Sequence, residues 1–256
     1  MRTDRAEAFR TERAEMLRFC GELDDREWSA ASNAAGWSVQ DVVAHLGATC
    51  RSFFTPSMVT LMRMRDLERT NDVFVDQRRG QPVSRTLAEY ERWSRMIGVA
   101  ARLPLDRLRL PMAELGWFPG GLMIAGAMTF DHHTHLRHDI APALGRPVPG
   151  TDANRMATVL EWMFAVLRNQ LRSAQPAWFA QPLTIELEGP GGGIWSVGPG
   201  GVVTGGPSDK PAAMITGRAI DFPEWATHRA NWRRRDLRIS GDADYAARFL
   251  DFVRVV

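Results

Sequence analysis

The spacing of apolar residues changes once along the chain, about two thirds of the way from its start. Over residues 4–23 the apolar side chains, among them Phe9, Met16 and Cys20, recur at helical intervals, which is typical of one buried helix face. The same spacing predicts further helices over residues 39–64 with a kink at Pro56, and over residues 84–103, 122–144 and 153–172.

Local signals indicate where these helices begin and what joins them. Ser38 is a suitable N-cap, and Asp41 three residues later completes a box-like start for the helix of residues 39–64. Residues 71–82 are mostly polar and predict a loop, while the prolines and glycines of residues 104–121 predict an irregular connection.

After residue 181 the pattern is that of short strands. Apolar and polar residues alternate over residues 182–187, and β-like runs follow at 194–197, 201–204, 212–215 and 237–239. Helices are expected over residues 218–228 and 242–253. The chain is therefore predicted to be an α+β protein, with an N-terminal four-helix-type bundle over residues 1–175 and a small C-terminal α/β domain over residues 181–256.

Composition narrows the class of protein only slightly. The 256 residues are 45% hydrophobic and 24% charged, as in ordinary globular proteins, and the formal net charge of +2 is too small to indicate a nucleic-acid partner. Residues 1–15 are unlike a signal peptide, and no stretch has the roughly 20 apolar residues that cross a bilayer. A cytoplasmic protein with no membrane partner is expected, and its oligomeric state stays open.

Histidines are concentrated in one predicted helix. Four of the six fall within residues 130–140, and a fifth, His45, lies in an earlier helix. At about 100° per residue, Asp131, His135 and His138 share one helix face. An i, i+4 pair is well placed to supply two ligands to one metal ion, and His45 is the natural third ligand from a neighbouring helix.

This set of side chains favours a catalytic metal site. Two imidazoles and one carboxylate leave one position open on a four-coordinate ion. The set suits zinc best, with nickel, iron and manganese as alternatives. A histidine cluster is also compatible with a packed or solvated helix face, and spacing alone does not decide between these interpretations.

Several segments resemble a known family. Residues 36–46 (GWSVQDVVAHL) are similar to the opening motif of the mycothiol-dependent maleylpyruvate isomerase family, and residues 23–28 resemble the run that precedes it. Asp131-x-x-x-His135 resembles the acidic-x-x-x-His pair of that family. Residues 239–242 and the helix after them resemble the end of its C-terminal domain.

The resemblance implies a DinB-like metal-binding bundle followed by a sterol-carrier-like domain. It implies that His45, Asp131 and His135 bind a divalent metal ion, zinc by preference, and that a low-molecular-weight thiol, mycothiol, is the cosubstrate. The implied reaction is addition of the thiol to a small electrophilic substrate, giving cis–trans isomerisation or thiol S-transfer. Two alternatives stay open: a metal-dependent hydrolase that uses metal-bound water, and a non-catalytic small-ligand-binding protein.

The sequence departs from the family pattern beside the second histidine. Family members commonly show His-x-x-Asp here, whereas Asp139 lies four residues after His135 and His138 takes the i+3 place. The role of Asp139 in orienting His135 is therefore open, and His138 or His132 becomes a candidate additional or substitute ligand.

The arginine-rich segment of the C-terminal part holds a candidate catalytic residue. The family resemblance places an arginine near the active site, and Arg229 fits that place best, with Arg234 as the alternative. Arg229 would bind a substrate anion through both arms of its guanidinium. A solvated run of charges is the competing interpretation.

Two residues near His45 also have competing interpretations. Asp41 is one turn before His45, so it is expected either to cap the helix or to orient the imidazole. Cys50 is poorly aligned with His45 around the helix, and a buried structural thiol is expected there.

Overall fold

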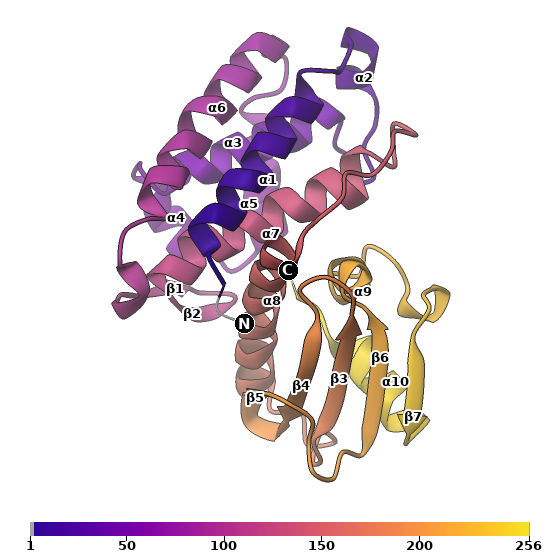
Figure 1. Ribbon diagram of the computed structural model, residues 1–256. Helices are drawn as coiled ribbons and strands as arrows, with labels where there is room; N and C mark the ends of the chain where they lie inside the picture. The colour runs from indigo at the N-terminus through magenta and orange to yellow at the C-terminus, as the bar shows by residue number, and fades with distance from the viewer. Residues whose placement is uncertain (1–2, 256) are drawn as a thin grey trace. The chain divides into compact units, whose positions relative to one another are not determined.

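The computed structural model describes residues 3–255, which form two compact units that divide between Gly150 and Thr151. The first unit is mainly helical with one β-hairpin, and the second combines helices with a five-stranded sheet (Figure 1). The predicted α+β class, with an N-terminal helical part and a C-terminal sheet, is confirmed.

Four long helical segments form the bundle of the first unit: α1, α3, α6, and a continuous helix made of η2, α7 and η3. Helix α3 packs against α6 and α7, and α1 packs against α6 and α7. The elements in chain order are α1 (Arg5–Cys20), α2 (Asp25–Ser29), α3 (Val39–Ser52), α4 (Ser57–Arg63), α5 (Leu67–Asp76), α6 (Val83–Ala100), η1 (Leu105–Arg107), β1 (Arg109–Met112), β2 (Gly116–Pro119), η2 (Leu122–Gly126), α7 (Ala127–Thr134) and η3 (His135–Ile140).

Helix α3 begins where the sequence predicts. The hydroxyl of Ser38 accepts a hydrogen bond from the N–H of Asp41 at 3.1 Å, and the Asp41 carboxylate accepts one from the N–H of Ser38 at 3.0 Å. This capping box satisfies two backbone donors that a helix start otherwise leaves unpaired.

A hydrophobic core surrounds α3 in the first unit. Its buried side chains are Met16, Phe19, Cys20, Trp28, Val39, Val42, Val43, Leu46, Tyr90, Leu136, Ile140 and Ala141.

Several local predictions were wrong. The single kinked helix over residues 39–64 is two helices, because Pro56 lies at the start of α4 and α3 ends at Ser52. Helix α5 covers much of the predicted loop, since Asp66 caps its start and Phe74 and Val75 are buried. The predicted irregular connection contains the β1–β2 hairpin.

The second unit contains a mixed sheet with the strand order β5-β4-β3-β6-β7. Strands β3 and β6 are parallel, and the other neighbouring pairs are antiparallel. The elements are α8 (Ala153–Ala174), β3 (Leu183–Glu188), β4 (Gly193–Gly198), η4 (Pro199–Gly201), β5 (Val202–Gly205), β6 (Ala213–Arg218), η5 (Ala219–Asp221), α9 (Phe222–Ala226), η6 (Trp232–Arg234), β7 (Arg238–Gly241) and α10 (Ala243–Phe252).

Helix α8 belongs to the second unit, so the division lies before it and differs from the predicted boundary near residues 175–181. Phe164 stacks on Trp195 of β4, with ring centroids 4.4 Å apart, and on Phe222 at 5.2 Å. Gly201 lies so close to α8 that a Cβ there would be 2.3 Å from the carbonyl oxygen of Arg168. These contacts hold α8 against the sheet.

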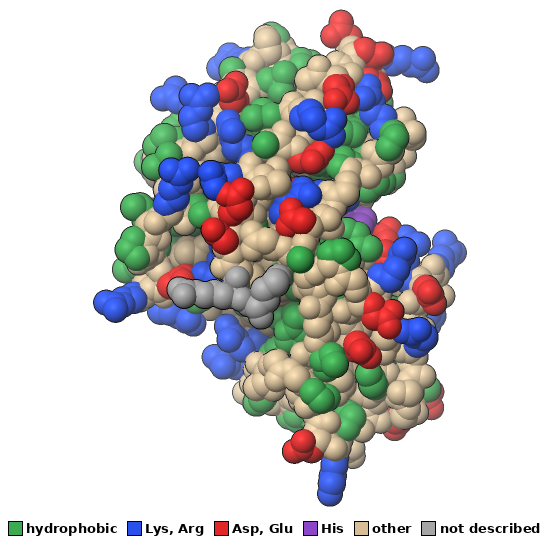
Figure 2. All heavy atoms as spheres, viewed as in Figure 1, with side chains coloured by type: hydrophobic (Ala, Val, Ile, Leu, Met, Phe, Trp, Pro, Cys, Tyr) green, Lys and Arg blue, Asp and Glu red, His purple; other side chains and the backbone are tan. Residues whose placement is uncertain are grey.

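The surface of the protein carries both signs of charge. Figure 2 shows acidic and basic side chains interspersed over the face in view, in keeping with the net charge of +2. Within residues 3–255, no helix combines the length and the apolar character needed to cross a membrane.

The close approach of α3 and α6 gives a test of the bundle. A Cβ on Gly47 would lie 3.2 Å from the backbone N and Cα of Tyr90. We expect Gly47→Val to lower the free energy of unfolding by about 1–3 kcal/mol, because the two helices must separate. Urea denaturation followed by circular dichroism measures this change.

Gly98 on α6 provides the matched control. A Cβ on Gly98 would make ordinary contacts at 4.0 Å with Phe9 and Arg10. Gly98→Ala is therefore expected to raise the free energy of unfolding by up to about 1 kcal/mol. Equal stability of Gly47→Val and the unsubstituted protein would contradict the close packing of α3 on α6.

Candidate metal centre

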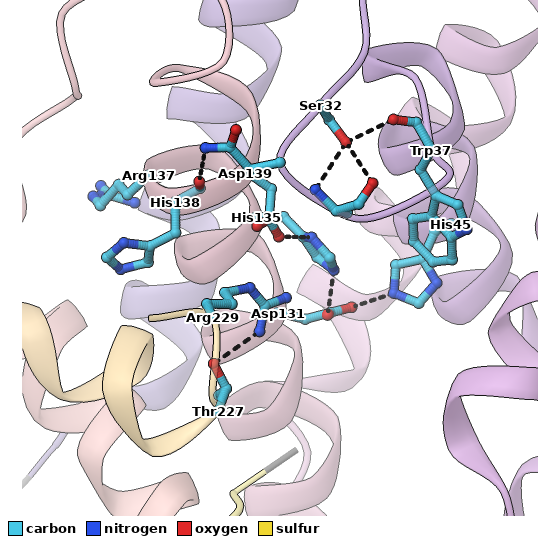
Figure 3. Close-up of polar contacts among 12 residues, drawn as sticks. Ser32, Trp37, His45, Asp131, His135, Arg137, His138, Asp139, Thr227 and Arg229 are labelled. Carbon is cyan, nitrogen blue, oxygen red and sulfur yellow. Dashed lines mark hydrogen bonds and ion pairs between the residues drawn. The ribbon is translucent and has the colours of Figure 1, made fainter. Parts of the chain in front are cut away.

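Three of the predicted ligands come together in the first unit. His45 lies on α3, Asp131 lies on α7, and His135 follows one turn later where η3 begins. One nitrogen of each imidazole and one oxygen of the carboxylate all lie within 4.8 Å of one another. Figure 3 shows the three side chains pointing toward one another.

The histidine–carboxylate distances in this group are longer than ordinary charge-assisted hydrogen bonds and leave room for a metal ion. Nε2 of His45 is 3.4 Å from Oδ2 of Asp131, and Nε2 of His135 is 3.3 Å from Oδ1. Charge-assisted N–H···O bonds are usually about 2.7–2.9 Å long. Two ligands that each lie about 2.1 Å from a tetrahedral zinc ion are about 3.4 Å apart. The nitrogen and oxygen donors are also those that zinc accepts.

Asp139 orients His135. Its Oδ2 accepts a hydrogen bond from Nδ1 of His135 at 2.7 Å, so Nε2 is the nitrogen that faces Asp131. The helix is locally a π-helix here, with the N–H of Ala141 bonded to the carbonyl of Leu136 five residues earlier. A turn that contains an extra residue brings Asp139 closer to His135, four residues earlier, than a regular α-helical turn does. The altered spacing therefore does not remove the role of Asp139.

The two carboxylates make the site favourable for positive charge. Burial raises the pKa of Asp131, but the neighbouring imidazoles of His45 and His135 outweigh it and hold the pKa well below the usual range. Burial lowers the pKa of His135, but the carboxylates of Asp131 and Asp139 outweigh it and raise the pKa to about 9. A cation at this place, a proton or a metal ion, is stabilised by the same two carboxylates.

Trp37 fixes the two imidazoles from one side. Its ring centroid lies 5.0 Å from that of His45 and 6.3 Å from that of His135. The indole N–H donates a hydrogen bond to Oδ1 of Asp72 on α5 at 2.9 Å. Within the described chain, Nδ1 of His45 is buried with no hydrogen-bond partner, so packing against Trp37 takes over the orienting role.

The other candidate ligands point elsewhere. The His132 side chain is buried between the rings of Phe9 and Tyr90, and its Nδ1 lies 2.7 Å from the carbonyl oxygen of Met128. Burial lowers the pKa of His132 to about 4, as expected for a neutral core imidazole. Figure 3 shows the His138 side chain directed away from the three ligands, and the structure therefore groups three ligands rather than four.

Arg229 lies in the second unit, in the turn after α9. Its Nη1 donates to the hydroxyl of Thr227 at 3.0 Å, and that hydroxyl donates to the carbonyl of Pro223 at 2.7 Å. His228 between them has a left-handed backbone with φ of 60°. The Arg229 side chain is exposed, as is that of Arg234.

The Asp139 contact gives a test of the site. We expect Asp139→Asn to weaken zinc binding by about 10- to 100-fold, because the carboxylate no longer orients the His135 ring. Competition with a chromogenic zinc chelator measures the affinity.

Asp41→Asn is the matched control. Asp41 is one turn from His45, but its carboxylate accepts from the N–H of Ser38 and lies 3.7 Å from Arg79. The zinc affinity of the Asp41→Asn variant is expected to stay within about twofold of that of the unsubstituted protein, since a helix cap acts on stability rather than on the metal ligand. Equal loss in both variants would show that Asp139 does not act on His135 specifically.

Comparisons with known proteins cover both units of the chain. The sequence profile of the mycothiol maleylpyruvate isomerase N-terminal domain matches residues 9–141. One solved structure of the mycothiol-dependent maleylpyruvate isomerase shares 13% identity, with 94% of this chain and 96% of that chain covered and a TM-score of 0.54. A histidine-to-alanine mutant of that enzyme shares 12% identity over 90% of this chain and 93% of that chain, with a TM-score of 0.51.

The structural likeness supports the fold of the whole chain, and the sequence match identifies the family. No curated protein matches the chain. The matched residues 9–141 make up more than half of the 256 residues and include His45, Asp131 and His135. The chain therefore belongs to the mycothiol maleylpyruvate isomerase family.

Proposed function

We propose that this chain is a metal-dependent cytoplasmic enzyme that uses a mycothiol-type thiol to act on a small electrophilic substrate. Cis–trans isomerisation is the first candidate reaction, and thiol S-transfer is the second. Membership of the family supports the use of the thiol. The observation that carries the proposal is the group of His45, Asp131 and His135, whose ligand atoms lie within 4.8 Å of one another.

The three side chains would hold a zinc ion through two nitrogens and one carboxylate oxygen. When bound, the ion would supply a positive charge that keeps the sulfur of the thiol ionised near neutral pH. His45 and His135 are almost fully buried, whereas 18% of the Asp131 side chain is exposed. We propose that a small molecule reaches the group at this partly exposed carboxylate.

The protein itself does not supply a reactive thiol. The chain has two cysteines, Cys20 and Cys50, and both are buried. Burial raises the pKa of Cys20 to about 12, and burial together with the charge of Asp131 raises the pKa of Cys50 further. With both thiols buried and their pKa values raised, the nucleophilic sulfur of the proposed reaction would come from a separate molecule.

We propose that Arg229 binds the anionic group of the substrate, with Arg234 as the alternative. An exposed guanidinium offers paired donors that match a carboxylate. Thr227 limits the freedom of the Arg229 side chain through the 3.0 Å hydrogen bond. Arg234→Ala is the control for Arg229→Ala, because both changes remove one exposed charge from the same segment.

Metal analysis and turnover measured together test the proposed function. The purified full chain should contain about one zinc ion per molecule, and His45→Ala should lose it. With maleylpyruvate as the probe, conversion should require both zinc and added mycothiol, and mass spectrometry should detect a mycothiol adduct if the reaction is S-transfer. Arg229→Ala should raise KM at least about tenfold, as expected for loss of a charge-assisted contact.

Other outcomes would contradict this proposal. Turnover without any thiol would support a hydrolase instead. Absence of stoichiometric metal, with ligand binding unaffected by His45→Ala, would support a non-catalytic binding protein.

The buried cysteines give a separate prediction. In the native protein, Cys20 and Cys50 should react with Ellman's reagent only very slowly at pH 8, because both pKa values are raised and both side chains are inaccessible. Both should react at once in guanidinium chloride. Rapid reaction of either thiol in the native protein would contradict the conclusion that the nucleophilic sulfur is external.

A further inference from the structure

A cavity in the first unit is lined by none of the three candidate metal ligands. It has a volume of about 440 Å³ and is formed by the end of α3, the segment between α5 and α6, and residues 85–93 of α6. This volume is in the range of small-molecule sites. The lining residues that carry its charge are Arg51, Arg78, Arg85, Glu89 and Arg92.

The one acidic side chain of this lining is already paired. Nε and Nη2 of Arg78 donate to the two oxygens of Glu89 at 3.0 and 2.8 Å, and Nη1 of Arg78 donates to the carbonyl of Phe74 at 2.8 Å. Arg78 is only 8% exposed. Arg51 lies farther from Glu89, at 3.5 Å. The Arg78–Glu89 pair therefore builds the wall and leaves the other arginines without a strong partner.

Arg85 and Arg92 contribute uncompensated positive charge. Within residues 3–255, neither side chain forms an ion pair. The guanidinium of Arg92 lies over the ring of Trp93, 5.0 Å from its centroid, and Trp93 stacks on Phe54. Arg51, Arg85 and Arg92 line the same cavity with like charges, and an anion bound there would offset their mutual repulsion.

The cavity also offers a hydrogen-bond acceptor. Oε1 of Gln81, another lining residue, is buried and has no donor among the described residues. Its backbone carbonyl accepts a hydrogen bond from the side chain of Gln40 at 2.7 Å, which holds the backbone of Gln81 in place. A hydroxyl group of a bound molecule would satisfy the free oxygen.

We propose that this cavity binds a small phosphate monoester that also carries hydroxyl groups, of the sugar phosphate class. A phosphate monoester has a charge of about −1.5 to −2 and three acceptor oxygens, which matches Arg51, Arg85 and Arg92 better than a single carboxylate does. The proposal does not depend on the metal centre or on the proposed reaction.

Isothermal titration calorimetry on the full chain tests this site with D-glucose 6-phosphate as the probe. Binding should be tighter than for inorganic phosphate or succinate, and glucose should not bind. Arg85→Ala and Arg92→Ala should each weaken binding about tenfold, as expected for loss of a charge-assisted hydrogen bond. Gln81→Ala should weaken the binding of glucose 6-phosphate but not of inorganic phosphate.

Arg95→Ala is the matched control for surface charge. Arg95 is on the same helix but pairs with Glu91 at 2.7 Å and does not line the cavity. The affinity of the Arg95→Ala variant for glucose 6-phosphate should stay within about twofold of that of the unsubstituted protein. Circular dichroism melting identifies any variant that fails to fold, and Arg85→Gln and Arg92→Gln then replace the alanine variants.

Four results would overturn the proposal. The first is that glucose 6-phosphate does not bind at millimolar concentrations, and the second is that succinate binds as tightly as glucose 6-phosphate. The third is that Arg95→Ala weakens binding as much as the two lining variants do. The fourth is that Arg85→Ala and Arg92→Ala leave the affinity unchanged. Inorganic phosphate that binds as tightly as glucose 6-phosphate would overturn the role of the hydroxyl groups.

Discussion

The hydrogen bond between Nδ1 of His135 and Asp139 determines the geometry of the candidate metal centre. It fixes which nitrogen of His135 faces Asp131, and Asp131 in turn is shared with His45 from another helix. Asp139 is 1% exposed, and a buried carboxylate without a partner is strongly destabilising. The π-helical turn and the orientation of His135 are therefore linked through one contact.

The parts of the fold that local signals determine could be predicted from the sequence. The capping box at Ser38 and Asp41 places the start of α3 correctly, because both partners are three residues apart. The position of α8 could not be predicted in the same way: the sequence pattern placed it with the bundle, whereas in the structure it groups with the sheet. Its apolar face indicates only that it is buried, and its partners Trp195 and Phe222 are 31 and 58 residues away from Phe164 in the sequence. Local spacing carries no information about which sheet or helix covers such a face.

At the candidate site, too, the local features could be predicted from the sequence, whereas the long-range contacts could not. The i, i+4 spacing of Asp131 and His135 is local, and the structure brings this pair to His45. The spacing of His138 and Asp139 was misleading, because it was interpreted with the regular period of 3.6 residues while the helix has an extra residue per turn here. Asp72 was missed because it acts through Trp37, 35 residues earlier, and lies in a segment predicted to be a loop.

Arginine, which supplies all the positive side chains except Lys210, illustrates why composition alone does not reveal sites. Arg137 is buried and satisfied by Glu12 at 2.8 Å and by the carbonyls of Pro149 and Gly150. Arg78 is similarly satisfied by Glu89. The high arginine content explains neither the burial of Arg137 and Arg78 nor the lack of ion pairs at Arg85 and Arg92 among the described residues of the chain. The state of pairing separates arginines that stabilise the fold from those that remain available to an anion, because only the latter gain from binding one.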